Sequence, residues 1–222
     1  MTTFITGAAR GLGRTLTEAL AARGEAVIGT HRAPVPAALA PRARWLAADM
    51  ADPASIAALG PALGSAPLHT LICNAGLYAD RGQRLDDGYP PALWAEVFAV
   101  NVTGVFLTIQ TLLPALRRAP GAKIAILSSQ MGSDTRAGGG SYIYRASKAA
   151  VLNLGRNLAA DLKAEGIAVG IYHPGWVQTD MGGPSAAITP AAAADGLLAR
   201  FAALSPATTG CFETWDGTPF PF

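Results

Sequence analysis

The chain has 222 residues, of which 50% are hydrophobic and 14% are charged, against about 25% charged residues in an average globular domain. With a mean hydropathy of +0.29, this composition excludes a disordered chain and is typical of a compact globular protein. The formal charge is +2 and the basic residues form no run, so binding to nucleic acid or to an anionic membrane surface is not favoured.

The start of the chain and its cysteines predict a cytoplasmic protein. The first residues lack the charged start and apolar segment of a signal peptide, and no apolar stretch is expected to reach the ~18 to 20 residues of a membrane span. Cys73 and Cys211 lie outside any Cys-x-x-Cys pair and are expected to be reduced thiols. His31, His69 and His173 do not cluster at metal-ligand spacing, so no metal site is expected.

Short apolar runs alternate along the chain with longer helical segments. The predicted strands are Thr3–Thr6, Ala26–Thr30, Ala43–Ala48, Thr70–Cys73, Lys123–Leu127, Ala168–Tyr172 and Cys211–Thr214. Most of them are continuously apolar, as expected for strands covered on both faces. The predicted helices are Arg14–Arg23, about Ala92–Leu116 and Tyr142–Glu165. This alternation predicts an α/β fold: one Rossmann-type, doubly wound parallel sheet of about seven strands, in a single domain of residues 1–222.

Three irregular segments follow the carboxyl ends of predicted strands. They are Leu77–Pro91, Gly132–Ser141 and Met181–Thr189. Because ligands of open α/β sheets bind at that edge, we expect the functional site there.

The first predicted strand leads directly into a glycine-rich turn, Thr6-Gly7-Ala8-Ala9-Arg10-Gly11-Leu12-Gly13, which a helix follows. Glycines permit a tight turn and a close approach to a pyrophosphate, and the helix N-terminus offers free N–H groups to the phosphates. The pattern indicates a dinucleotide site, although a plain strand-to-helix turn uses glycines in the same way. The spacing G-x-x-x-G-x-G differs from the commoner G-x-G-x-x-G.

The end of the second predicted strand indicates which dinucleotide is bound. NAD sites usually place an acidic residue there to bind the ribose 2′-hydroxyl, whereas this strand ends at Thr30-His31-Arg32 without one. Arg32, together with Arg10 of the glycine turn, could instead donate bidentate hydrogen bonds to a 2′-phosphate. Either arginine could be a solvated surface charge, but together they favour NADP, with NAD also possible.

Tyr144 and Lys148 are four residues apart and therefore lie on one face of their predicted helix. The pKa of an ordinary tyrosine, near 10, must fall by about 3 for acid–base work near pH 7, and a neighbouring ammonium with an oxidised nicotinamide can supply that change. Ser129, after the strand Lys123–Leu127, could present its hydroxyl to a substrate carbonyl. For Ser128 we expect a buried turn-capping role. Taken alone, the tyrosine–lysine spacing also fits an ordinary helix-surface pair.

These motifs follow one another in a recognisable order. The chain carries T-G-x-x-x-G-x-G (Thr6 to Gly13), N-A-G (Asn74, Ala75, Gly76), Asn101, Ser129, Y-x-x-x-K (Tyr144, Lys148) and P-G-x-x-x-T (Pro174, Gly175, Thr179). This series resembles the short-chain dehydrogenase/reductase family, from the first strand to beyond the sixth. The segments around Y-R-A-S-K and H-P-G-W-V-Q-T-D-M-G-G resemble its compact C-factor-like and carbonyl-reductase-like branch.

The resemblance implies catalytic roles for four residues. Tyr144 is implied to be the general acid of carbonyl reduction, with Lys148 lowering its pKa and holding the nicotinamide ribose. Ser129 is implied to bind the substrate oxygen. Asn101 would lie in a helix that exposes a carbonyl to water, with a simple helix-surface amide as the alternative.

The resemblance also implies which residues bind the cofactor. Those of the glycine turn are Thr6, Gly7, Arg10, Gly11, Leu12 and Gly13, and Arg32 joins them from the second strand. Asp49 and Met50, after the third strand, match the position that contacts adenine, although a turn role for Asp49 is equally in keeping with the pattern. Asn74, Ala75 and Gly76 would pass the adenosine ribose, with Asn74 also able to tie neighbouring strands together. Pro174, Gly175, Val177 and Thr179 would line the nicotinamide.

The expected function is NADP(H)-dependent transfer of hydride between the nicotinamide and a small carbonyl or alcohol substrate, with reduction of a ketone or aldehyde preferred. A homodimer or homotetramer formed through the two long helices is expected. The alternatives are an NAD-dependent alcohol dehydrogenase and a dinucleotide-binding signalling protein of C-factor type in which catalysis is incidental.

Overall fold

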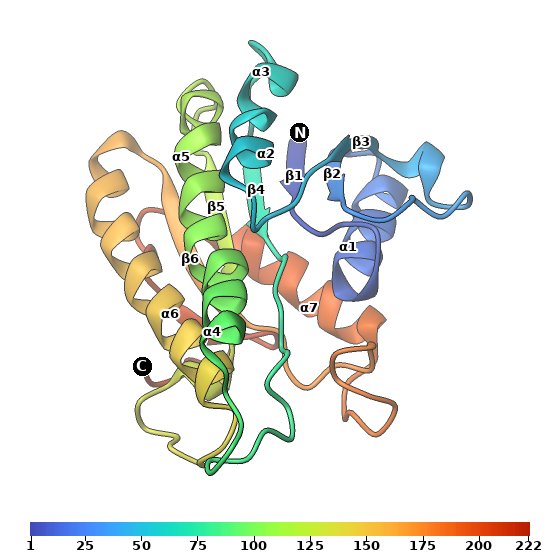
Figure 1. Ribbon diagram of the computed structural model, residues 1–222. Coiled ribbons are helices and arrows are strands. Elements are labelled where there is room, and N and C mark those ends of the chain that lie inside the picture. Colours follow the sequence, from blue (N-terminus) through green and yellow to red (C-terminus); the bar gives the residue numbers. More distant parts are fainter.

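A computed structural model describes all 222 residues and contains one seven-stranded sheet in the order β3-β2-β1-β4-β5-β6-β7 (Figure 1). The strands are β1 (Thr2–Ile5), β2 (Ala26–His31), β3 (Arg44–Ala47), β4 (Thr70–Cys73), β5 (Lys123–Leu127), β6 (Ala168–His173) and β7 (Phe212–Thr214). Every neighbouring pair is parallel. The predicted α/β class and the number of strands are confirmed, with strand ends shifted by one residue in several places.

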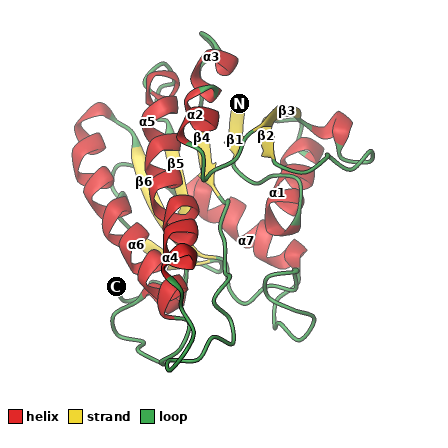
Figure 2. Ribbon diagram, viewed as in Figure 1, coloured by secondary structure: helices red, strands yellow, loops and turns green.

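Helices cover both faces of the sheet (Figure 2). The helices α1 (Gly11–Ala22) and α7 (Pro190–Ala203) pack together and contribute Leu16 and Leu197 to an apolar cluster with Ile5 and Ile72 of the sheet. The other face is covered by α2 (Pro53–Ala57), α3 (Leu59–Leu63), α4 (Pro91–Phe98), α5 (Gly104–Leu116) and α6 (Tyr142–Leu162). Because helices lie on both sides, every residue of β6 is buried, which explains the continuous apolar runs.

The sequence-based prediction lacks α2, α3 and α7. The last of these begins with clear signals, since the side chain of Thr189 accepts a hydrogen bond from the N–H of Ala192 and Pro190 occupies the first turn. Its first turns are nearly all alanine, however, so the apolar periodicity that marks an amphipathic helix is weak there. Three short 3₁₀ turns complete the structure: η1 (Ala40–Arg42), η3 (Gln130–Gly132) and η4 (Lys163–Glu165).

The helices α4 and α5 form one continuous run, Pro91–Leu116, that a π turn, η2 (Ala99–Thr103), interrupts. The expectation that no apolar stretch reaches the length of a membrane span is wrong for this run, which is long and apolar enough to pass such a test. In the structure Ile109 and Leu112 pack with Leu71 and Ile124 of the sheet. Core helices of soluble proteins pass the same test, and packing on the sheet is the role that this one has.

The strand order reverses between β1 and β4, which are neighbours at the centre of the sheet. The chain leaves β1 toward α1 on one face, whereas the chain that leaves β4 leads to α4 on the other (Figure 1). Loops that diverge in this way make the carboxyl edge of these two strands the place where ligands of doubly wound sheets bind.

Candidate active site

The glycine turn lies at this central position, between β1 and α1. Gly7 and Gly11 have φ angles of 65° and 51°, which side chains other than glycine rarely adopt. At Gly13 a Cβ would overlap the carbonyl oxygen of Gly7, so only glycine lets the helix start so close to the turn. The first turn of α1 contains no acidic residue and no side-chain cap. Its N–H groups are therefore suited to an anionic group such as a pyrophosphate.

Asn74 ties the glycine turn to the end of β4. Its side-chain amide donates to the carbonyl oxygens of Thr6 and Gly7, at 2.9 and 3.1 Å. The hydroxyl of Thr6 accepts in return from the backbone N–H groups of Asn74 and Ala75, both at 3.0 Å. The side chains of Thr6 and Asn74 therefore hold two strands together, and of the two roles weighed for Asn74 the geometry shows the strand-tying one.

Arg32 and Asp49 follow the neighbouring strands β2 and β3 and face each other. A guanidinium nitrogen of Arg32 lies 3.8 Å from a carboxylate oxygen of Asp49; the Arg32 side chain is largely exposed and that of Asp49 is partly exposed. Asp49 also accepts a hydrogen bond from the N–H of Ala51, which is the turn role weighed for it. Arg10 is exposed. Met50, by contrast, has its side chain in the apolar core, so only its backbone is available to a ligand.

The segment after β6 closes against the glycine turn. A Cβ placed on Gly11 would lie 3.7 Å from the side chain of Thr179, which brings the P-G-x-x-x-T motif to the G-x-x-x-G-x-G motif. Gly175 has a φ of 85°, and Val177 is buried and forms a β-bridge with Ile188. Of these residues, Thr179 lies next to the glycine turn, and Leu12 of the turn packs against the apolar cluster under α1.

Tyr144, Lys148 and Ser129 meet where β5 ends and α6 begins. The ammonium nitrogen of Lys148 lies 5.6 Å from the centre of the Tyr144 ring and donates to the carbonyl oxygen of Leu127 at 2.9 Å. The hydroxyl of Ser129 lies close enough to the Tyr144 phenol to lower its pKa, and it accepts a hydrogen bond from the N–H of Met131 at 3.1 Å. Ser128 is buried, as expected, but its hydroxyl donates to the carbonyl of Lys148 within α6. The turn-capping role expected of it belongs to Ser129, which caps η3.

Burial shifts the pKa of both titratable groups of this cluster. Desolvation raises the pKa of Tyr144 to about 12, which the nearby Ser129 hydroxyl only partly opposes. Desolvation lowers the pKa of Lys148 to about 8. The sequence predicts a lowered pKa for the tyrosine, whereas the chain's own groups hold the phenol protonated at neutral pH.

Asn101 lies in the π turn η2 and is fully buried. Its side chain accepts from the N–H of Leu77 at 2.7 Å and donates to the carbonyl of the same residue at 2.9 Å. It also donates to the hydroxyl of Ser147 at 3.0 Å. The alternative of a helix-surface amide is therefore wrong. A Cβ on Gly76 would lie 3.5 Å from the Lys148 ammonium and 3.6 Å from the Asn101 oxygen, which places these three residues together.

Two residues of this site were not found by sequence reasoning. The ring of Tyr78 stacks on that of Tyr144, and the carboxylate of Asp80 accepts hydrogen bonds from the N–H groups of Ile143 and Tyr144. Both residues belong to the irregular segment after β4, and the one available signal was that this segment follows the carboxyl end of a central strand.

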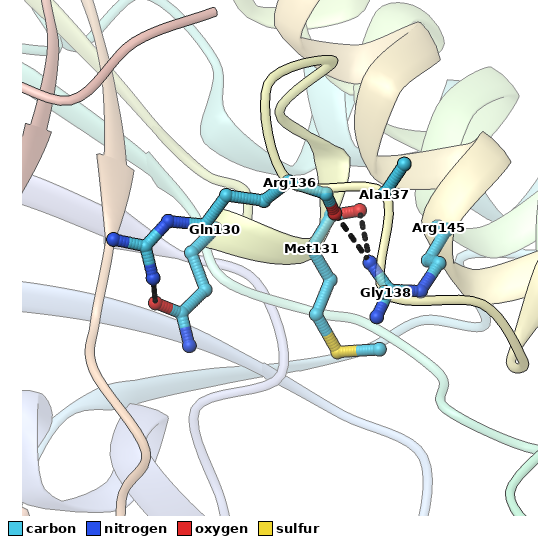
Figure 3. Close-up of a pocket in the computed structure, with 6 residues that line it drawn as sticks. All are labelled: Gln130, Met131, Arg136, Ala137, Gly138 and Arg145. Carbon is cyan, nitrogen blue, oxygen red and sulfur yellow. Dashed lines mark hydrogen bonds between the residues drawn. The ribbon is translucent and has the colours of Figure 1, made fainter.

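A cavity of about 420 Å³ lies between η3 and the start of α6 (Figure 3). Its lining consists of Gln130, Met131, Arg136, Ala137, Gly138 and Arg145, which include the neighbours in sequence of Ser129 and Tyr144. Arg145 holds the segment between η3 and α6 by donating to the carbonyl oxygens of Arg136 and Gly140. Arg136 donates only to the Gln130 side chain. Neither guanidinium forms an ion pair with a carboxylate.

The cysteines and histidines form no further site. Cys73 is buried and Cys211 half-buried, and both are free thiols. Burial raises the pKa of Cys73 to about 12, so this thiol is unreactive. No group of three or more His, Cys, Asp or Glu side chains is placed to hold a metal ion.

Comparison with known proteins identifies related chains across most of the sequence. A family model described as short chain dehydrogenase matches residues 1–188. The protein named C-signal from Myxococcus xanthus is 37% identical over 157 residues, which cover 70% of this chain and 93% of that one. The protein named 1-hydroxy-2-glutathionyl-2-methyl-3-butene dehydrogenase from Rhodococcus sp. (strain AD45) is 31% identical, with 98% of this chain and 97% of that one covered.

The fold has close counterparts among solved structures. The NADPH-bound carbonyl reductase from chicken fatty liver superposes with a TM-score of 0.90 at 29% identity, and the match covers 100% of this chain and 98% of the other.

Proposed function

Because this chain belongs to the short chain dehydrogenase family, whose members are oxidoreductases, we propose that it is an NADP(H)-dependent carbonyl reductase acting on a ketone or aldehyde. The observation that carries the proposal is the meeting of Ser129, Tyr144, Lys148 and Asn101 beside the glycine turn. The NADPH-bound chicken carbonyl reductase supports both the cofactor and the reaction type.

The residues around the glycine turn suit an NADP(H) molecule. The uncapped N-terminus of α1, behind a turn formed by Gly7 and Gly11, fits a pyrophosphate. Arg32 and Arg10 would hold the 2′-phosphate, with Asp49 beside Arg32. Ala75 and Gly76 would pass the adenosine ribose, and Pro174, Gly175, Val177 and Thr179 would line the nicotinamide. The bound nicotinamide supplies the hydride, and the chain supplies orientation and charge.

The chain's own side chains supply the proton. Tyr144, whose pKa burial raises to about 12, carries its proton at pH 7 and is ready to donate it to the carbonyl oxygen as negative charge develops there. Ser129 donates its hydroxyl to the same oxygen. Lys148, with a pKa lowered to about 8, remains mostly protonated at pH 7 and would hold a positive charge beside the Tyr144 ring. This protonation state favours reduction over alcohol oxidation.

The substrate body would occupy the cavity between η3 and α6. Its lining includes Met131 and Arg136. The Arg136 guanidinium donates to Gln130 and lies over the Phe220 ring but has no carboxylate partner, which suits a carbonyl compound with a polar or anionic substituent. The polypeptide would act as one domain and as a homodimer or homotetramer in the cytoplasm, joined through α4–α5 and α6. The exposed Phe106 on α5 supports that surface.

The signalling alternative rests on the relative named C-signal. The presence of Ser129, Tyr144, Lys148 and Asn101 in one region favours the enzyme. One measurement tests cofactor binding, which both readings share, and a second decides between them. A thermal-shift titration with NADPH and NADH should show stabilisation of about 2.7 kcal/mol at ~100 times the Kd, and more for NADPH at equal concentration. A panel of ketones and aldehydes should then show NADPH oxidation that depends on Tyr144. Absence of any cofactor-induced shift would contradict the proposal.

A further inference from the structure

The helix α6, which carries Tyr144 in its first turn, lacks an N-terminal cap of its own. The residue at the cap position, Ser141, is in the left-handed conformation (φ 47°, ψ 43°) and its side chain caps nothing. The first turn contains no acidic residue either. Free N–H groups at a buried helix start need partners from elsewhere.

The partner is Asp80, more than sixty residues earlier in the chain. One oxygen of its carboxylate accepts from the N–H of Ile143 at 2.8 Å and from the N–H of Tyr144 at 3.2 Å. A negative charge at a helix N-terminus also interacts favourably with the helix dipole. The segment that carries Asp80 runs from β4 toward the end of the molecule where α6 begins (Figure 1).

The environment of Asp80 is unusual for a helix cap. The residue has no exposed surface, and its second carboxylate oxygen has no hydrogen-bond partner. Burying an anion in this way is costly, and a neutral serine or asparagine at the ordinary cap position would stabilise the helix equally well. The cost is understandable if the hydrogen bonds serve Tyr144, whose N–H donates one of them.

The groups that face Tyr144 come from three parts of the chain. Tyr78, Asp80 and Arg81 approach from the segment after β4, Ser129 from the turn after β5, and Lys148 from the next turn of α6. Among these groups, only Asp80 accepts a hydrogen bond from the N–H of Tyr144. The charge of Asp80 also raises the pKa of Tyr144, which Arg81 opposes.

We propose that Asp80 is a positioning residue, whose buried carboxylate fixes the backbone of the first turn of α6 and so holds the Tyr144 hydroxyl against Ser129 for proton donation. This inference rests on the proposed function, because it takes Tyr144 as the general acid. Small displacements of an acid from its acceptor are costly: about 1 Å can reduce turnover by about a hundredfold.

The test compares Asp80→Ala, Asp80→Asn and the control Asp86→Asn. Asp86 lies in the same segment but is exposed. Asp80→Ala removes the acceptor and should lower kcat at least about tenfold, with the Kd for NADPH unchanged. Asp80→Asn retains a carbonyl oxygen for the two N–H groups and should recover kcat to within about threefold of the wild type. Asp86→Asn should match the wild type.

Hydrogen exchange of residues 142–146 provides a readout that needs no turnover. These amides should exchange faster in Asp80→Ala than in Asp80→Asn or Asp86→Asn. A kcat for Asp80→Ala within threefold of the wild type overturns the proposal, as does a loss in Asp80→Asn equal to that in Asp80→Ala. If Asp80→Ala does not fold, a kcat of Asp80→Asn more than threefold below that of Asp86→Asn overturns the proposal, whereas equal kcat values with protection of residues 142–146 retained support it. If the wild-type protein reduces no carbonyl compound, the proposed reductase function is refuted. The exchange data then still report whether Asp80 caps α6.

Discussion

The ring of Tyr78 lies against the ring of Tyr144, with their centroids 4.3 Å apart and their planes inclined by 23°. The hydroxyl of Tyr78 is hydrogen-bonded to that of Ser141 at 2.7 Å, just before α6, and the guanidinium of Arg81 lies 4.9 Å from the Tyr78 ring centre. Arg81 also donates to the carbonyl of Met181, in the segment after β6. The segment after β4 thus spans from the catalytic helix to the opposite side of the site.

Replacing Tyr78 with alanine is expected to lower kcat about tenfold, because an aromatic pair contributes about 0.5–1.5 kcal/mol beyond its buried area and the loss leaves Tyr144 free to move. Tyr78→Phe keeps the stacked ring and loses only the bond to Ser141, so it is the matched control. Steady-state kinetics of both variants check the prediction. Equal activities of the alanine and phenylalanine variants would show that stacking does not hold Tyr144.

Tyr144→Phe is expected to lower kcat by roughly 10²–10⁴, which is the usual contribution of general acid catalysis. The Kd for NADPH should remain within about threefold, because a single net hydrogen bond to the cofactor is worth only about 1 kcal/mol. Tyr142→Phe is the control: that residue is 40% exposed and packs on Tyr89. Initial rates and cofactor titrations of the two variants test this, and turnover by Tyr144→Phe close to the wild-type rate would rule out Tyr144 as the acid.

Lys148→Met is expected to stabilise the fold while removing activity. Burial lowers the pKa of Lys148 from its ordinary 10.5 to about 8, a difference of roughly 3 kcal/mol at 1.36 kcal/mol per pKa unit. The unfolded chain binds the proton of the Lys148 ammonium more tightly than the folded chain does. The free-energy cost of burying this charge is therefore complete below pH 8 and disappears as the pH rises from about 8 to 10.5.

The gain in unfolding free energy for Lys148→Met should therefore be largest at pH 7. It should reach up to roughly 3 kcal/mol, reduced by the contribution of the lost hydrogen bond to the Leu127 carbonyl. It should shrink by pH 10. Urea unfolding at both pH values measures it, with Lys163→Met, outside the site, as a control. A variant less stable than the wild type at pH 7 would contradict this account.

Arg32→Ala is expected to lower the ratio of kcat/KM for NADPH to that for NADH by about 10- to 100-fold, the worth of a charge-assisted hydrogen bond to the 2′-phosphate. Asp49→Asn should raise the ratio, because it removes the carboxylate 3.8 Å from the Arg32 guanidinium. Arg14→Ala, on the exposed face of α1 where it pairs with Glu18, is the control for loss of a nearby charge. An unchanged ratio in Arg32→Ala would assign the phosphate to another group.

Features set by local spacing could be predicted from the sequence. The turn from Gly7 to Gly13 needs glycines for reasons of backbone geometry, and the Tyr144–Lys148 pair follows from the helix period. The continuous apolar runs of β5 and β6 predicted their burial under helices on both faces. Each of these inferences depends on neighbours within about one turn or one strand.

Features set by distant segments could not be predicted in this way. Asp80 and Tyr78 are separated from α6 by α4, α5 and β5, and no local pattern pairs them with Tyr144. The pKa of Tyr144 was expected to be low because the Lys148 ammonium is one helical turn away and an oxidised nicotinamide would add to its effect. Burial raises that pKa instead, and the groups that act on the phenol come from distant segments. Arg32 and Asp49 meet because β2 and β3 are paired, which turns two separate candidates into one ion pair.

The π turn η2 constrains the length of the chain at one point. A π turn holds one more residue than an α-helical turn, and here Gly104 donates to the carbonyl of Ala99, five residues earlier. Deleting one residue between Ala99 and Thr103 would restore a regular helix and rotate α4 by about 100° relative to α5. Asn101 would then swing away from Leu77 and Ser147. Although apolar helices tolerate many substitutions, this one is intolerant of a change in residue number, and homologous chains should differ here by replacement and not by insertion or deletion.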